Sequence, residues 1–390
     1  MSHTAVMIPG LDQLGGAELQ AMALAKGMRR RGWRVSMVTL TGTGGAAAAE
    51  LNESGVEFLS LGMCKGLVDP RGWARFHRWL RRERPDIVHA HLPHAAWMAR
   101  WSRLASRVPV LIDTLHSSST GTMGRRLGYA VSRRWPDRVT AVSRAAARSH
   151  LDAGMVRKES LSVLPNGIDT GFWRPDPHAR ATLRRALGLT DEFLWLAAGR
   201  LEEVKGYPLL LTAISRTPET ARLVVLGEGP QRTELLQLAE RLGLQQRVRF
   251  QGFEGKVRRW MQAADGFVLA SQYEGLPMVL LEAGACGLPA AATDVAGTRE
   301  VLVNGETGWL TCSEGPDALT AVLTRLMRVT PEERRAMGER ARRFVIENFS
   351  LERVLDRWEE LYTELLERHR MRSSRLRMRE VFTRQSATET

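Results

Sequence analysis

Two glutamates, Glu274 and Glu282, lie eight residues apart on either side of a Gly-Leu-Pro turn that precedes a predicted helix. Pro277 suits the first position of that helix, whose free N–H groups form an anion site. Carboxylates beside an anion site are useful when the anion also carries hydroxyl groups that need acceptors. A sugar nucleotide has both a diphosphate and such hydroxyls. The alternative interpretation is a surface turn followed by an ordinary helix with one buried acid.

A second group of charges follows a predicted strand at residues 193–198. Arg200 presents a planar fork of N–H donors and Lys205 a point charge, and both suit phosphate oxygens. Gly206 allows the backbone to turn into the next helix. The alternative is a solvated loop in which Glu202 and Glu203 neutralise the two cations.

Strand and helix signals alternate along the chain, which indicates parallel sheets with helical crossovers. The predicted strands lie at residues 4–8, 34–40, 87–91, 108–113 and 139–142, and then at 193–198, 223–226, 248–250 and 266–269. Each half therefore resembles an open Rossmann-type sheet with a glycine-rich first turn. Ligands of such sheets bind at the carboxyl ends of the strands, so two facing sheets would form a binding cleft.

Length and composition agree with two or three globular domains. The 390 residues are 44% hydrophobic and 25% charged, which allows full-sized cores. No secretory signal is evident, and the longest stretch without Asp, Glu, Lys or Arg, residues 35–49, is too short and polar to cross a bilayer. The three scattered cysteines indicate a reducing compartment and neither a disulfide framework nor a zinc site.

The basic charge is concentrated in the first half: the net charge is +13, and residues 1–170 carry +11 of it. A predicted helix at residues 71–82 combines Phe76, Trp79 and Leu80 on one face with surrounding arginines. A second basic cluster comprises Arg125, Arg126, Arg133, Arg134 and Trp135. Two interpretations stay open, a helix that covers the sheet with a solvated basic face and a helix that lies on an anionic membrane.

The order and spacing of these motifs resemble family 4 glycosyltransferases. The matching motifs are Gly15-Gly16, Arg200 with Lys205-Gly206, and Glu274 with Glu282, supported by Ala141-Val142-Ser143, Pro165-Asn166-Gly167-Ile168-Asp169, Val224 to Pro230, and Gly305-Glu306-Thr307-Gly308. The resemblance extends from Thr4 to about Leu366. It implies an α/β GT-B fold with two Rossmann-like parallel-sheet domains facing across a cleft and a C-terminal helix returning to the N-terminal domain.

The resemblance also implies domain boundaries. Residues 1–169, with a returning helix at about 350–368, would form the acceptor-binding domain. Residues 170–349 would bind the sugar nucleotide. Residues 370–390 are predicted to be a basic and mobile tail.

Individual residues receive roles from the same resemblance. Arg200 and Lys205 would neutralise the leaving diphosphate, Glu274 would hold hydroxyls of the donor sugar, and Glu282 those of the ribose. His116, which follows a predicted strand, matches a histidine near the transferred sugar. His91 and His94 are acceptor-contact candidates. The remaining donor contacts are assigned to Gly15, Gly16, Gly252, Gly275 and Leu276.

No metal site is predicted. His89, His91 and His94 resemble metal ligands by number, but their spacing across a strand end is poor for ligation, and no carboxylate or cysteine accompanies them. The chain also lacks an Asp-x-Asp pair. We therefore expect Arg200, Lys205 and a helix N-terminus to neutralise the diphosphate. The nucleotide sugar is the donor substrate, and no cofactor or divalent metal is expected.

These expectations describe a retaining hexosyltransferase that uses a UDP-sugar, or alternatively a GDP-sugar, on a glycan or lipid-linked acceptor in bacterial surface polysaccharide or lipopolysaccharide synthesis. It would be cytoplasmic, with an anionic membrane surface as a candidate partner at the inner face of the cytoplasmic membrane. Two alternatives remain: a GT-B relative such as an epimerase or phosphorylase, and a non-catalytic membrane- or glycan-binding protein. Nucleic acid is not an expected partner, because no recognition motif is present. The sequence leaves the donor, acceptor, linkage and oligomeric state open.

Overall fold

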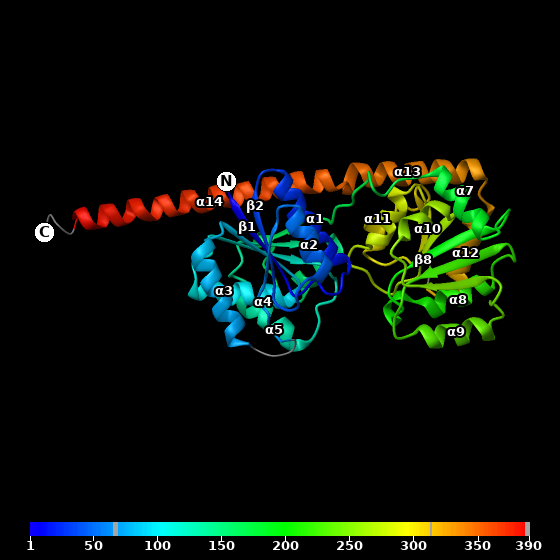
Figure 1. The fold of residues 1–390 in the computed structure, drawn as a ribbon, viewed down its shortest axis with the longest axis horizontal. Coiled ribbons are helices and arrows are strands. Elements are labelled where there is room, and N and C mark those ends of the chain that lie inside the picture. Colours follow the sequence, from blue (N-terminus) through cyan, green and yellow to red (C-terminus); the bar gives the residue numbers. More distant parts are fainter. Residues whose placement is uncertain (65–68, 313, 387–390) are drawn as a thin grey trace. The chain divides into compact units, whose positions relative to one another are not determined.

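A computed structural model describes residues 1–64, 69–312 and 314–386, with side chains described as far as residue 374. The chain divides into two compact units (Figure 1). The first unit contains residues 1–142, 146–164 and the chain from Val354 onward, and the second contains residues 143–145 and 165–353. Each unit has its own parallel sheet.

The first unit contains a seven-stranded sheet in the order β3-β2-β1-β4-β5-β6-β7. All neighbouring strands are parallel. The chain builds outward from β1 to β3 and then returns to add β4 beside β1, so the sheet has its switch point between β1 and β4. The strands are β1 (His3–Ile8), β2 (Arg34–Thr39), β3 (Glu57–Ser60), β4 (Ile87–His91), β5 (Val110–Leu115), β6 (Arg138–Ala141) and β7 (Leu161–Val163).

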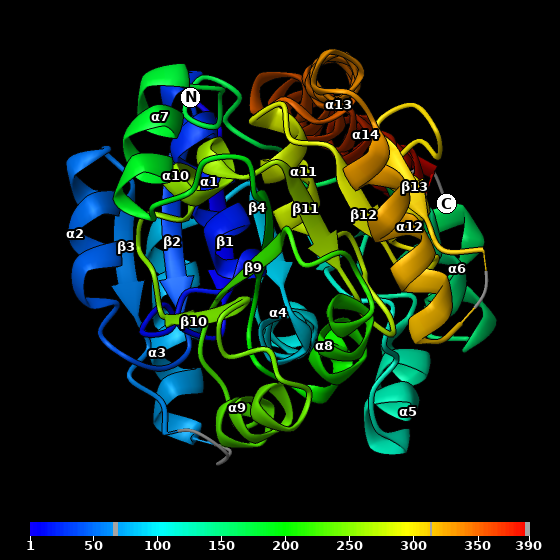
Figure 2. The ribbon, with the colours of Figure 1, turned by 90° about the vertical axis from the view of Figure 1, so that its right-hand side faces the viewer.

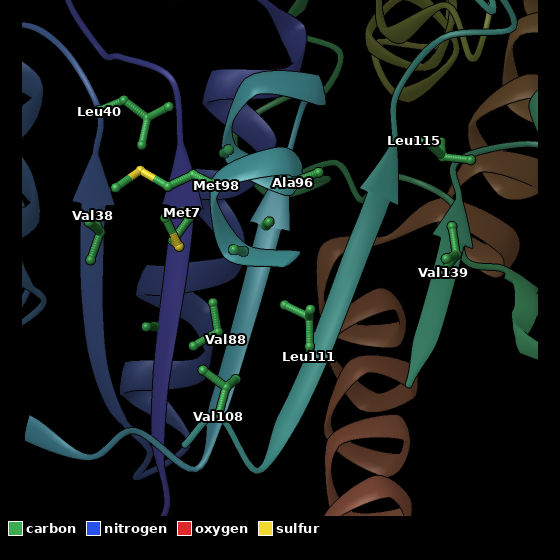
Figure 3. Packing of buried hydrophobic residues seen from close by; sticks show 14 of the residues in the cluster. Met7, Val38, Leu40, Val88, Ala96, Met98, Val108, Leu111, Leu115 and Val139 are labelled. Atoms are coloured by element: carbon green, nitrogen blue, oxygen red, sulfur yellow. The ribbon is translucent and has the colours of Figure 1, made fainter. Parts of the chain in front are cut away.

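Helices cover both faces of this sheet (Figure 1). They are α1 (Gly16–Arg30), α2 (Gly45–Glu53), α3 (Pro70–Glu83), α4 (Pro93–Ala105), α5 (Met123–Ser132) and α6 (Arg144–Asp152), with a short turn at Lys158–Ser160. On one face, strand residues such as Met7, Val88 and Leu111 pack with Ala96 and Met98 of α4 (Figure 3). The alternate strand residues point to the opposite face, as the pleat requires.

The second unit contains a six-stranded parallel sheet in the order β10-β9-β8-β11-β12-β13. Its switch point lies between β8 and β11. The strands are β8 (Phe193–Ala198), β9 (Ala221–Leu226), β10 (Val248–Gly252), β11 (Gly266–Leu269), β12 (Ala290–Ala292) and β13 (Gly308–Leu310). The helices are α7 (Pro177–Ala186), α8 (Tyr207–Ser215), α9 (Arg232–Arg241), α10 (Val257–Ala263), α11 (Met278–Ala285), α12 (Pro316–Arg328) and α13 (Pro331–Phe349), with short turns at Glu203–Lys205 and Thr298–Glu300. Figure 2 shows α8 and α9 on one face of this sheet and α10 and α11 on the other.

The last helix, α14 (Leu351–Ser386), starts in the second unit and continues in the first. Its residues Trp358, Tyr362 and Leu366 are buried. The Glu359 carboxylate accepts hydrogen bonds from the Trp33 indole and the Arg31 guanidinium, so this helix packs on the sheet face that carries α1. The predicted helix end near residue 368 is wrong, because the helix continues to Ser386. Residues 369–386 contain no Gly or Pro and consist largely of good helix formers, so nothing in the local sequence ends the helix. The last four residues of the predicted tail lie outside the described part of the chain.

Candidate active site

The predicted donor-site residues of the second unit lie at the carboxyl edge of its sheet. Strands β8 and β11 are neighbours at the switch point, so the loop at residues 199–206 and the loop at residues 270–277 leave the sheet side by side. The backbone N–H of Gln272 donates to the carbonyl of Val204 at 2.8 Å, which joins the two loops. Ligands of open parallel sheets bind at such a point.

Lys205 and Glu274 form the centre of this edge. The Lys205 ammonium lies 2.7 Å from Oε1 of Glu274, and the Ser271 hydroxyl donates to the same oxygen at 2.7 Å. The side chains of Lys205 and Glu274 are 25% and 11% exposed. No role was predicted for Ser271 from the sequence. Its position three residues before Glu274 could have indicated a hydrogen bond to that carboxylate. The structure therefore brings a cation, an anion and a hydroxyl together in a shielded cluster.

Gly206 permits the close approach of the two loops. Its φ is +64°, a left-handed conformation, and a Cβ built on it would lie 2.0 Å from the carbonyl oxygen of Ala270. Any side chain would push the Lys205 loop away from the end of β11. The same residue ends the turn at Glu203–Lys205 and precedes α8. A glycine is thus required here by both space and backbone conformation.

Arg200 is not part of the Lys205–Glu274 cluster in this structure. Its side chain is 77% exposed and pairs with Oε1 of Glu202 at 2.5 Å. The contact of Arg200 with Glu202 therefore agrees with the alternative prediction, in which the loop is solvated and its glutamates neutralise its cations. Lys205 instead pairs with Glu274. An exposed pair of this kind is worth about 0–1 kcal/mol. Arg200 can consequently turn toward an anion at small cost.

Glu282 is the fifth residue of α11 and is half-buried. Desolvation raises the pKa of its carboxyl to about 7. Among the described residues, no side chain or backbone group forms a hydrogen bond with this carboxyl group. The helix begins at Met278, and Pro277 occupies the N-cap position, one residue earlier in the helix than predicted. The carboxyl oxygens of Glu282 are thus available to accept hydrogen bonds from a ligand.

The glycines of the donor prediction lie in the loops of the same edge. Gly275 and Leu276 precede α11, whose first-turn N–H groups have no partner within the helix. Gly252 ends β10, and its carbonyl accepts the N–H of Gly227 at 2.8 Å. Phe253, which follows, is 85% exposed. Gly297, which sequence analysis did not single out, lies so close to Glu274 that a Cβ would be 2.6 Å from the Glu274 carbonyl oxygen.

In the first unit, His91 and His116 lie together at the carboxyl ends of β4 and β5. Nδ1 of His91 is 2.9 Å from Nε2 of His116, so one ring donates a hydrogen bond to the other. Burial lowers the pKa of His116 to about 4 and that of His91 well below its ordinary value. Both rings are therefore neutral at pH 7. The buried atoms Nε2 of His91 and Nδ1 of His116 have no hydrogen-bond partner among the described residues. The pair thus offers one open donor and one open acceptor.

His89 anchors this row of histidines to α14. Its two ring nitrogens lie 2.7 Å from the Tyr362 hydroxyl and 2.7 Å from Oγ1 of Thr114. Its ring centroid is 4.1 Å from that of His91 and 4.6 Å from that of Trp358. Burial lowers the pKa of His89 to about 3. His89 is therefore a packing residue whose polar atoms are satisfied inside the protein.

The other predicted residues of the first unit lie at the same carboxyl edge. His94 is exposed in the first turn of α4, which follows β4 directly. Gly15 and Gly16 start α1 after β1, and the Gly15 N–H donates to Oε2 of Glu18 at 3.1 Å. Residues 1–64, 69–312 and 314–386 contain no group of three His, Cys, Asp or Glu arranged to hold a metal ion. They also contain no helix that is both long and apolar enough to cross a membrane.

Comparison with protein families matches both halves of the chain. Residues 14–172 match the model described as "Glycosyltransferase Family 4", and residues 179–344 match "Glycosyl transferases group 1".

Among characterised proteins, the chain is 31% identical over 304 residues to the N-acetyl-alpha-D-glucosaminyl L-malate synthase of Bacillus anthracis, covering 73% of this chain and 76% of that protein. It is 34% identical over 287 residues to a GDP-mannose-dependent alpha-(1-6)-phosphatidylinositol monomannoside mannosyltransferase of Mycolicibacterium smegmatis, covering 68% and 73%. Among solved structures, Anabaena HepE in complex with UDP and glucose superposes with a TM-score of 0.83 at 22% identity, covering 93% of this chain and 100% of that one.

Proposed function

Because the chain belongs to glycosyltransferase family 4, we propose that it transfers a hexose from a nucleoside diphosphate sugar to a glycan or lipid-linked acceptor, with retention of configuration at the anomeric carbon. The observation that carries this proposal is the cluster of Lys205, Glu274 and Ser271 at the switch point of the second sheet. The cluster presents a cation for phosphate beside a carboxylate for hydroxyl groups. A sugar linked to a diphosphate has both.

In the donor site, the two phosphates would lie between Lys205 and the N-terminus of α11. Arg200 would leave its exposed contact with Glu202 and add a second cation. Glu274 would accept hydrogen bonds from the donor sugar, and Glu282 from the ribose. Fixed positive charge at the point where the diphosphate leaves is the electrostatic help that such a transfer needs. We assign this neutralisation to the protein and to no divalent metal.

The transfer itself would proceed on one face of the sugar. The acceptor oxygen forms a bond to the anomeric carbon as the bond from that carbon to the phosphate oxygen breaks. The proton of the acceptor hydroxyl passes to the departing phosphate oxygen, so no protein base is required. His116, neutral at pH 7, would hydrogen-bond the transferred sugar through its unpaired nitrogen, with His91 and His94 nearer the acceptor.

The relatives do not agree on one donor or one product. One mycobacterial relative is named for GDP-mannose, whereas HepE has been solved with UDP and glucose. Another relative, from Rhizobium meliloti, is a lipopolysaccharide core biosynthesis glycosyltransferase. We favour a UDP-sugar as donor, with a GDP-sugar as the alternative, and synthesis of a bacterial surface glycan as the process.

For a lipid-linked acceptor, the first unit would have to approach the anionic inner face of the cytoplasmic membrane. Phe76, Trp79 and Leu80 cannot supply that contact, because all three are buried in the core. Many of the exposed large apolar side chains of the first unit lie instead on α4 and α5.

On α5, Met123, Leu127 and Val131 form one stripe and are 64% to 74% exposed. Trp97 and Trp101 of α4 lie beside it, because Trp97 packs against Gly128 and Trp101 against Trp135. Arg126, Arg133 and Arg134 are exposed on or next to α5. Apolar side chains rimmed by arginines suit an interface of anionic lipid.

The test is an assay of nucleoside diphosphate release with a panel of UDP- and GDP-sugars and extracted lipid-linked acceptors, with the product anomer assigned by NMR. Release of diphosphate that depends on acceptor, with an α-linked product from an α-linked donor, is the expected result. Conversion of the sugar without net release would instead support an epimerase. Binding of nucleotide without any turnover would support the non-catalytic alternative.

A further inference from the structure

A cavity lies in the first unit, at the edge of the sheet opposite to His91 and His116. Its volume is about 780 Å³, and it lies among the ends of α3 and α4 and the middle of α14. Two of its lining residues, Asp86 and Pro109, directly precede β4 and β5. Because β4 rises about 3.3 Å per residue, the cavity is roughly 16 Å along the strand from His91. It is therefore separate from the edge where the predicted acceptor residues lie.

The walls of this cavity are strongly cationic. The residues that line it include four arginines and one histidine, which are Arg81, Arg84, Arg107, Arg370 and His369. None of the four arginines has an ion-pair or hydrogen-bond partner for its side chain among the described residues. The only acid in the lining is Asp86, whose Oδ2 already accepts the backbone N–H of His3 at 2.9 Å. The lining thus carries four positive charges from arginines against the single negative charge of Asp86.

Helix termini explain only part of this arrangement. Arg81 and Arg84 lie at the C-terminal end of α3, and Arg107 follows α4, positions where the helix dipole favours cations. His369 and Arg370 come from the interior of α14, where no such dipole effect applies. Four arginines and one histidine from three separate elements converge on one space, which a capping preference does not produce.

The chemistry of the lining indicates the ligand. Guanidinium groups are the side chains best suited to phosphate oxygens. Three serines also line the cavity, of which Ser106 pairs with His77 and Ser373 with His369. Leu80 and Leu366 supply an apolar portion of the wall. The volume falls in the range of small-molecule sites, and so exceeds the need of a lone orthophosphate. We propose that this cavity binds a phosphate-bearing anion, either a soluble phosphate ester or a lipid headgroup, at a site distinct from the sugar-transfer site.

The test compares two double charge reversals in the full chain. R107E/R370E changes the cavity, whereas R78E/R241E makes the same charge change at exposed arginines that do not line it. Pyrophosphate and inositol hexakisphosphate serve as soluble probes in titration calorimetry. Vesicles of phosphatidylcholine with 20% phosphatidic acid, against pure phosphatidylcholine, serve as the lipid probe in co-sedimentation.

We expect R107E/R370E to weaken binding by about 100-fold or more, because it removes two charge-assisted contacts that are each worth about one factor of ten, while R78E/R241E stays near wild type. A selective loss with a soluble probe identifies a phosphate ester, and a selective loss with vesicles alone identifies a lipid headgroup. Equal behaviour of the two variants with every probe, or no binding of any probe, would overturn the proposal.

A separate measurement keeps this outcome apart from that of the transferase proposal. The thermal shift produced by UDP reports the second unit, and the melting transition of the first unit shows whether each variant is folded. R107E/R370E should retain that shift in full. A UDP shift that is absent from wild type would count against the donor site and leave the phosphate result unaffected.

Discussion

At the scale of single residues, the candidate site is defined by a few contacts that sequence order does not display. Lys205 and Glu274 are distant in the chain, yet their charged atoms are 2.7 Å apart and shielded from solvent. Ser271 fixes the same carboxylate oxygen. Such a cluster holds its charges in place before a ligand arrives, which lowers the cost of reorganisation during transfer.

Replacing Glu274 tests this cluster. Glu274→Gln keeps the shape of the side chain and removes its charge, so we expect turnover to fall by about 100-fold or more. The measurement is diphosphate release at saturating donor, with circular dichroism as the check of folding. Glu203→Gln, an exposed carboxylate in the neighbouring loop, is the matched control and should stay near wild type. Full activity in both Glu274→Gln and Lys205→Ala would refute the assignment.

Glu282 makes the stability of the second unit depend on pH. Its pKa rises from 4.5 in the unfolded chain to about 7 in the folded one, so the folded state binds the proton more tightly. Stability should therefore fall as the pH rises from about 4.5 to about 7 and then level off. The melting temperature of Glu282→Gln should lack this slope. An exposed control, Glu240→Gln, should retain it, and identical slopes in all three proteins would contradict the prediction.

At the scale of elements, two features were not predicted from the sequence: the C-terminal end of α14 and the exposed apolar stripe of α5. Helix α14 contributes Trp358 and Tyr362 to the wall behind the histidine row, and so couples the end of the chain to β4. Helix α5 buries Tyr129 and leaves a stripe of large apolar side chains exposed. One helix completes a core, and the other leaves large apolar side chains exposed.

Removal of one hydroxyl tests the packing of α14. Tyr362→Phe leaves Nδ1 of His89 buried without a partner, which should cost about 1–3 kcal/mol. We expect the unfolding transition of the first unit to move down by several degrees in calorimetry. Tyr273→Phe changes a half-exposed tyrosine of the second unit and should leave that transition in place. An unchanged first transition in Tyr362→Phe would mean that this hydrogen bond contributes nothing.

A charge placed on α5 tests the membrane surface. Leu127→Glu introduces a carboxylate at a position that is 64% exposed, so the fold should tolerate it while binding to anionic vesicles falls. Leu236→Glu, at an exposed position of the second unit, is the control. Binding of the wild type should also weaken as salt rises. Vesicle binding that is equal in both variants would remove α5 from the interface.

At the scale of the whole molecule, the chain contains two separately cored units, and their ligand chemistry differs. The first unit carries a row of neutral histidines at one sheet edge and a cationic cavity at the other. The second carries the charged donor cluster. A nucleotide should therefore stabilise the second unit more strongly than the first.

Calorimetry with nucleotides tests that division. UDP at about 100 times its dissociation constant should stabilise the second unit by about 2.7 kcal/mol and raise its melting temperature by several degrees. The transition of the first unit should move far less. GDP in place of UDP is the comparison that identifies the base, and UMP tests the need for a diphosphate. A shift confined to the first unit would place the nucleotide in the wrong half of the chain.

The sequence by itself predicted the two parallel sheets, because strand and helix periodicity is a local property that repeats along the chain. It also singled out Lys205 and Glu274, because glycine- and proline-rich turns after apolar strands mark the carboxyl edge of a sheet. Helix α14 ran past its predicted end for the opposite reason: residues 369–386 carry no local stop signal.

Only the tertiary structure decided which of these residues touch. Pairing of β8 with β11 brings Lys205 to Glu274, and packing turns Phe76 and Trp79 of α3 inward while Leu127 of α5 stays exposed. The cationic cavity likewise needs α14 beside α3 and α4. Contacts between residues far apart in sequence depend on strand order and on which face of each helix packs against a core. Local periodicity determines neither of these.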